Sequence, residues 1–141
     1  MKEKDTSDLT RELMNEADID AYIKSNRTYF TEREMVELLT ALCEQRNLAK
    51  AAVARQAGMS EVYLYQVFSG RRKPSRDRLL CLCVGLGASL EEAQELLKRA
   101  SYAKLYPKSK RDAIIIHGLV YGKTLGEIND KLFHENEKTL S

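Results

Sequence analysis

Residues 48–69 constrain the fold more than any other stretch, because they predict two short helices joined by a tight turn. Residues 49–57 are strong helix formers, and Gly58 after them tolerates the left-handed conformation of a helix C-cap. Ser60 can then cap a second helix that ends at Phe68. Ala54 is small where the second helix has to cross the first. The stretch therefore predicts two helices that meet at a steep angle.

Apolar residues at helical spacing dominate the rest of the chain, which contains no internal repeat. Ile114 to Ile116 favour a strand by propensity, but a lone strand would have no partner, so we predict a helix there. The overall expectation is an all-α bundle of roughly seven or eight helices. Three pairs of a hydroxyl residue followed by glutamate three positions later predict capping boxes. These pairs are Thr31 with Glu34, Ser89 with Glu92, and Thr124 with Glu127.

The distribution of charge is more informative than the net charge of +2. One basic stretch spans residues 71–78 with Asp77 as its single acid, and a second spans residues 98–111 with no acid between its basic residues. Such clustering favours a polyanion on one face, and a solvated face is the alternative reading. The basic residues are Arg71, Arg72, Lys73, Arg76 and Arg78, then Lys98, Arg99, Lys104, Lys108, Lys110 and Arg111.

Several classes of protein are disfavoured by the composition. No apolar run approaches the roughly 20 residues that span a bilayer, and no apolar stretch follows the first residues, so we expect a cytoplasmic protein without membrane contact. Cys43, Cys81 and Cys83 are an odd number of cysteines, which we expect to be small buried residues. His117 and His134 lie on different predicted helices, and we expect His117 to be a core residue. We predict no enzymatic activity, no metal and no cofactor.

Several features between residues 48 and 97 occur together at a characteristic spacing. They are Val53, Ala54, Gly58, Met59, Ser60, Leu64, Val67, the loop 69–75, Leu79, Leu80, Leu82 and residues 85–92. Their combination resembles the Cro/XRE, or lambda-repressor-like, helix-turn-helix family of bacterial regulators. The resemblance implies a five-helix DNA-binding domain at residues 31–101, with helical extensions at residues 1–30 and 102–141.

The resemblance also implies a mode of recognition, in which the second helix of the motif lies in the major groove of double-stranded DNA. By position, the residues that face the bases are Glu61, Val62 and Gln66. Gln66 can pair with adenine, Val62 can pack on a thymine methyl group, and Glu61 can accept a hydrogen bond from cytosine. The residues expected at the DNA backbone are Lys50, Ser60, Tyr63, Tyr65, Arg71, Arg72 and Lys73.

Three residues depart from the family pattern and keep a second function open. Glu61 puts a negative charge where the helix would enter the groove, although it also suits the positive end of its own helix. Phe68 stands where the family often has an acid, and Ala49 stands where it has a capping threonine. The alternative function is a protein-binding adaptor, in which Tyr63, Tyr65 and Phe68 dock a partner protein. A regulator that responds to a small molecule through its C-terminal helices ranks last, because no ligand motif supports it.

The C-terminal part carries more apolar residues than a solvated arm needs. Ile114 to Ile116 alone cover about 200° of a helix, so this helix must be covered by its own chain or by a second copy. We expect a homodimer through the C-terminal helices, and folding back onto the domain is the alternative. The residues available for either contact are Ile114, Ile115, Ile116, Leu119, Leu132 and Phe133.

Overall fold

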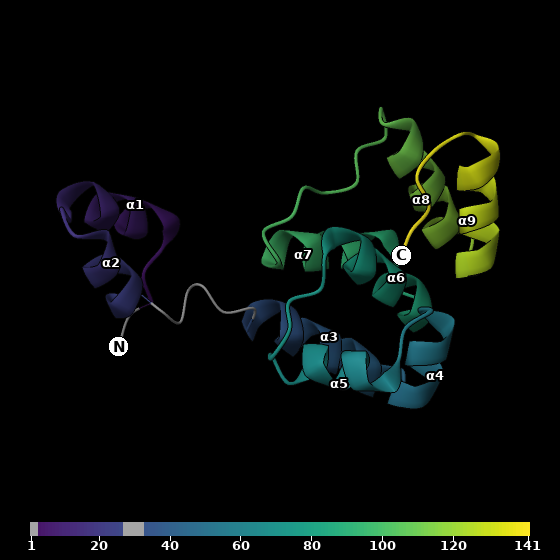
Figure 1. Cartoon of the computed structure of the whole chain (residues 1–141), viewed down its shortest axis with the longest axis horizontal. Coiled ribbons are helices and arrows are strands. Elements are labelled where there is room, and N and C mark those ends of the chain that lie inside the picture. Colours follow the sequence, from purple (N-terminus) through teal and green to yellow (C-terminus); the bar gives the residue numbers. More distant parts are fainter. Residues whose placement is uncertain (1–2, 27–32) are drawn as a thin grey trace. The chain divides into compact units, whose positions relative to one another are not determined.

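The computed structural model describes residues 3–26 and 33–141, and every regular element in these residues is a helix (Figure 1). The described residues contain nine helices, slightly more than the seven or eight expected. The predicted all-α fold class is therefore confirmed. The chain divides into two compact units, one up to Thr31 and one from Glu32 onward.

The first unit is a helix pair, α1 (Thr6–Asn15) and α2 (Ile19–Ser25), with a polar centre. Asn26 is fully buried, and its amide donates to Glu12 at 3.1 Å while its oxygen accepts from Lys4 at 2.8 Å. Lys4 also forms an ion pair with Glu12 at 2.7 Å. This hydrogen bond from Lys4 lowers the pKa of Glu12. A satisfied polar network thus joins the two helices.

The second unit is arranged around α6, whose residues are buried on most sides. Residues 79–83 of this helix are all buried, and α6 packs against α4, α7 and α9. Figure 1 shows α6 between the lower layer of α3, α4 and α5 and the pair formed by α8 and α9. The helices are α3 (Arg33–Gln45), α4 (Lys50–Gln56), α5 (Glu61–Phe68), α6 (Arg76–Leu86), α7 (Leu90–Arg99), α8 (Lys110–Val120) and α9 (Leu125–His134).

Helix starts follow the capping residues closely. The boxes predicted at Ser89 and Thr124 are both formed, because each hydroxyl accepts from the backbone amide of the glutamate three positions on and that glutamate bonds back. Ser75 and Ser109 cap α6 and α8 in the same way, without the reciprocal glutamate. The box predicted at Thr31 lies outside the described residues.

The C-terminal helices pack against their own chain. Ile115 and Leu132 are fully buried, and Leu119 is 8% exposed, so the unit itself covers most of the surplus that motivates a homodimer. Residues 114–116 lie in α8, which excludes the strand reading. Phe133 is the exception at 72% exposed.

His117 is a correction to the sequence-based expectation. It is exposed rather than buried, and its ring lies against Tyr121 with centroids 4.5 Å apart. The neighbouring Ile115 and Leu119 turn toward the core, so the apolar surroundings of His117 in sequence do not carry over to its side of α8.

Two arginine–aspartate pairs join the start of α6 to the start of α8. Arg76 of α6 lies 3.1 Å from Asp112 of α8, and Arg111 of α8 lies 3.0 Å from Asp77 of α6. All four side chains are largely buried. Arg76 and Arg111 therefore do not belong to the polyanion-binding surface that the two basic stretches suggested, because aspartates neutralise both.

The backbones of α6 and α4 approach so closely that one added methyl group should destabilise the fold. A Cβ on Gly85 would lie 2.9 Å from the carbonyl oxygen of Val53 and 2.9 Å from the Cβ of Ala57. We expect Gly85→Ala to lower the free energy of unfolding by about 1–3 kcal/mol, measured in urea. Gly126→Ala in α9 is the matched control, because its Cβ would meet only Thr124, at 3.9 Å, and alanine favours a helix. Equal stability of the two variants would contradict this account.

Candidate nucleic-acid interface

A turn at residues 57–60 joins α4 to α5 and sets the angle between them. Gly58 has a left-handed φ of +67°, as predicted. The amide of Met59 donates to the carbonyl of Ala54 at 3.0 Å, and the amide of Gly58 donates to Arg55 at 3.2 Å. These two bonds form a Schellman motif, which ends α4 and satisfies its last carbonyl groups. Ser60 then caps α5 by accepting from the amide of Tyr63 at 3.1 Å.

Buried contacts hold α5 in place on its inner side. Leu64 and Val67 are fully buried, and Ala54 of α4 is 2% exposed. The turn is also covered from outside the motif, because the side chain of Leu125 in α9 lies 3.1 Å from the position of a Cβ on Gly58. The C-terminal pair therefore braces the turn that orients α5.

The outer side of α5 presents a small exposed face. Glu61, Val62 and Tyr65 lie on it, with Val62 68% and Tyr65 54% exposed. Two of the residues expected to face bases are thus outward, whereas Gln66 is half-buried. Tyr65, expected at the DNA backbone, shares the face of Glu61 and Val62, because residues three and four apart lie on one side of a helix.

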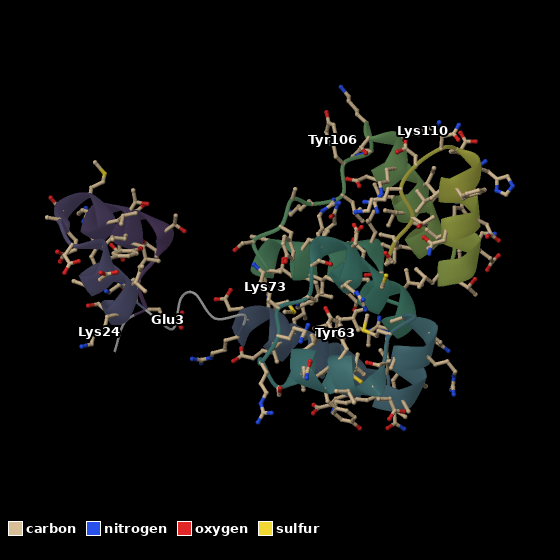
Figure 2. All side chains as sticks on the ribbon, in the orientation of Figure 1. Glu3, Lys24, Tyr63, Lys73, Tyr106 and Lys110 are labelled. Carbon is tan, nitrogen blue, oxygen red and sulfur yellow. The ribbon has the colours of Figure 1, made fainter. Side chains whose placement is uncertain are left out.

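The basic loop after α5 is fastened to the end of that helix. The amides of Arg71 and Arg72 both donate to the carbonyl of Gln66, at 3.0 and 3.2 Å. Arg71, Arg72 and Lys73 are all exposed. Arg71 and Arg72 therefore stand at the end of α5, whereas the ammonium of Lys73 lies 4.7 Å from the ring centroid of Tyr102, after α7 (Figure 2 labels Tyr63 and Lys73).

Aromatic rings hold several of the cations around α5. The ammonium of Lys50 lies 5.8 Å from the ring centroid of Tyr65 and 5.3 Å from that of Phe68. The guanidinium groups of Arg72 and Arg78 lie 5.5 and 4.8 Å from the Tyr63 ring. Each distance is within the range of a cation–π contact. The sequence alone places Arg78 only in the first basic stretch, because its aromatic partner lies on another helix.

Ion pairing leaves an uneven distribution of available positive charge. In residues 3–26 and 33–141, no carboxylate lies within 4.0 Å of Arg71, Arg72 or Arg78. The unneutralised guanidinium groups of this region therefore gather beside the exposed face of α5. Arginines that do have carboxylate partners are Arg33 with Glu37, Arg46 with Glu92, Arg76 with Asp112, Arg99 with Glu95, and Arg111 with Asp77.

The cysteines are buried, as expected. Burial raises the pKa of the Cys83 thiol to about 12, and burial together with the charge of Asp77 raises that of Cys81 to about 11. Both thiols are thus protonated at neutral pH and pack as small apolar groups. Within the described parts of the chain, no group of histidine, cysteine and acidic residues is arranged to hold a metal ion.

Comparison with known proteins agrees with this geometry. Residues 34–96, less than half of the chain, match a family model described as a helix-turn-helix domain, and the matched segment includes α4, the turn and α5. The chain therefore contains a helix-turn-helix domain. No curated protein and no solved structure is significantly similar to it. Among the described helices, none has the length and apolar character needed to cross a membrane.

The two helices of the motif begin with different capping residues, so substitutions at these positions test how much helix capping stabilises the motif. Ala49 begins α4 in extended conformation and makes no side-chain cap, whereas Ser60 caps α5. We expect Ala49→Ser to raise the free energy of unfolding by about 0.5–1 kcal/mol and Ser60→Ala to lower it by about 1 kcal/mol, measured by urea denaturation. A serine at position 49 that brings no gain would show that the first amides of α4 are already satisfied.

Proposed function

We propose that this chain is a Cro/XRE-type, lambda-repressor-like regulator that binds double-stranded DNA through α5 and acts in transcription. The observation that carries the proposal is the position of the exposed face of α5 beside Arg71, Arg72 and Arg78, which have no carboxylate partner among the described residues. A helix with a free outer face can enter the major groove, and nearby cations can then bind phosphates on its rim. No cofactor enters the proposal, and DNA binding places the protein in the bacterial cytoplasm.

The roles within this interface divide between bases and backbone. Glu61 and Val62 contact base edges, and the exposure of Tyr65 beside them supports a base or sugar contact for this residue as well. Gln66 reads a base in the proposal although it is half-buried, because its amide needs to expose only one edge. Contacts to the DNA backbone come from Lys50, Ser60, Arg71, Arg72 and Lys73, and Tyr63 contributes through the cations that lie at its ring.

The organisation of the chain follows from the same proposal. Residues 31–101 form the DNA-binding domain, residues 1–30 precede it as a helical extension, and residues 102–141 support it. A homodimer would place two copies of α5 about 34 Å apart on successive turns of DNA. The apolar residues that α8, its C-cap and α9 still expose for such a contact are Val120, Tyr121 and Phe133.

A protein-binding adaptor is the second candidate function. It is favoured by the exposure of Val62 and Tyr65 together with the negative charge of Glu61, a combination that also suits a protein surface. Measuring the binding of duplex DNA of random sequence separates the two candidate functions. Only a DNA-binding protein would bind such a duplex at low salt and release it as salt is added.

The loop after α5 gives the first test. Replacing Arg71, Arg72 and Lys73 by alanine should weaken binding to every duplex alike and reduce the slope of log affinity against log salt by up to about 3 units, because each phosphate contact contributes about 0.9. Alanine at three exposed lysines of the second basic stretch removes the same charge elsewhere and is the control. These lysines are Lys98, Lys104 and Lys108. An unchanged slope in the loop variant would remove the loop from the interface.

Base recognition gives a second test. Selection of preferred duplexes by the wild-type chain and by Gln66→Ala should yield sites that differ at one base pair, where the variant is less selective. On the preferred wild-type site the substitution should cost about 1–3 kcal/mol of binding free energy. The same selected sequence for both proteins would show that Gln66 does not read a base.

A further inference from the structure

Two arginines from different segments share one aromatic ring. Arg72 lies in the loop after α5, Arg78 lies in the first turn of α6, and Tyr63 lies in the first turn of α5. Their guanidinium groups are 5.5 and 4.8 Å from the ring centroid of Tyr63. The negative face of an aromatic ring attracts a cation. This attraction opposes the repulsion between the two guanidinium groups and so favours their position at the same ring.

The one acid in this basic stretch is turned away from the pair. The carboxylate of Asp77, next to Arg78 in sequence, lies 3.0 Å from Arg111 and 3.8 Å from Lys138. It accepts two hydrogen bonds from the guanidinium of Arg111, at 3.1 and 3.0 Å. Both shared arginines therefore keep their positive charge available for an external anion.

The backbone of all three residues is held by hydrogen bonds. The amide of Tyr63 donates to Ser60 at 3.1 Å, that of Arg72 to the carbonyl of Gln66 at 3.2 Å, and that of Arg78 to a capping serine at 3.1 Å. The fold thus fixes the backbone that carries both guanidinium groups, which reduces the entropy lost on binding.

We propose that Tyr63 is a positioning residue, whose ring holds Arg72 and Arg78 as a pair that binds the phosphodiester backbone of duplex DNA. Tyr63 is half-buried beneath these cations and does not itself contact the DNA, in contrast to the direct contact expected from the sequence. Arg78 becomes a phosphate-binding residue next to the loop. This inference rests on the proposed DNA binding and adds the means by which two of the cations are oriented.

The test compares two substitutions of Tyr63 by the salt dependence of binding to a random-sequence duplex. Tyr63→Phe keeps the ring and should leave the slope unchanged, whereas Tyr63→Leu removes the ring and should reduce it by about 1–2 units. Arg78→Gln should reduce the slope by about 1 unit, and Arg99→Gln should not, because Arg99 is paired with Glu95 on its own helix. Urea unfolding of each variant separates loss of binding from loss of fold.

A double-mutant cycle separates positioning from direct contact. In a chain that already carries Arg72→Gln and Arg78→Gln, Tyr63→Leu should cause no further loss of affinity, because it acts only through those arginines. An equal loss in both backgrounds, or a Tyr63→Phe variant as weak as Tyr63→Leu, would overturn the inference. The Arg78→Gln variant keeps Tyr63, so it tests the arginine pair even if the Tyr63→Leu variant is unfolded. An unchanged salt slope in Arg78→Gln would also overturn the inference.

Failure of this inference is distinguishable from failure of the proposed function. A wild-type chain that does not bind duplex DNA at low salt would reject both. A wild-type chain that binds with a steep salt dependence, together with Tyr63 and Arg78 variants that bind equally well, would reject only the role given to Tyr63.

Discussion

The close approach of α4 and α6 determines where the rest of the second unit can lie. Gly85 lets the backbone of α6 come against Val53 and Ala57, because no side chain separates the two helices there. Ala57 is also the last residue before Gly58, so the contact that anchors α4 fixes the point at which the chain turns toward α5. The orientation of the exposed face of α5 thus depends on a few small residues rather than on α5 itself.

The two arginine–aspartate ion pairs between α6 and α8 determine which cations remain available at the proposed interface. Partly buried ion pairs are a weak argument for stability, because desolvation offsets much of their attraction. Their effect on charge is clearer. Arg111 and Lys138 form ion pairs with Asp77, and Asp112 forms one with Arg76. The C-terminal segment therefore neutralises the single acid among residues 71–78. Residues far from α5 in sequence therefore change the electrostatics beside it.

Local features of the fold could be predicted from the sequence, because their causes lie within a few residues. The left-handed turn at Gly58 and the caps at Ser60, Ser89 and Thr124 follow from short-range hydrogen bonds. The exposed positions of Glu61 and Val62 follow from helical periodicity once Leu64 and Val67 are buried.

Contacts between distant residues could not be predicted in this way. The sequence places Arg76 and Arg78 in one basic stretch, yet Arg76 pairs with Asp112 and Arg78 lies over Tyr63. Nothing in their spacing distinguishes the two, since the difference arises only when α8 meets α6. The exposure of His117 has the same origin, because the side of α8 that packs inward depends on where α6 and α9 lie.

The burial of α6 explains why the C-terminal part carries more apolar residues than a solvated arm needs. A helix whose residues 79–83 are all buried needs neighbours on every side, and α4 and α7 cover only part of it. α9 packs on α6 and α8 packs on α7, so Ile115 and Leu132 complete a core that the preceding helices leave open. Because Leu125 of the same pair lies over Gly58, completing the core also braces the motif turn. The C-terminal pair therefore belongs to the structure that presents α5, although Val120, Tyr121 and Phe133 stay exposed on it.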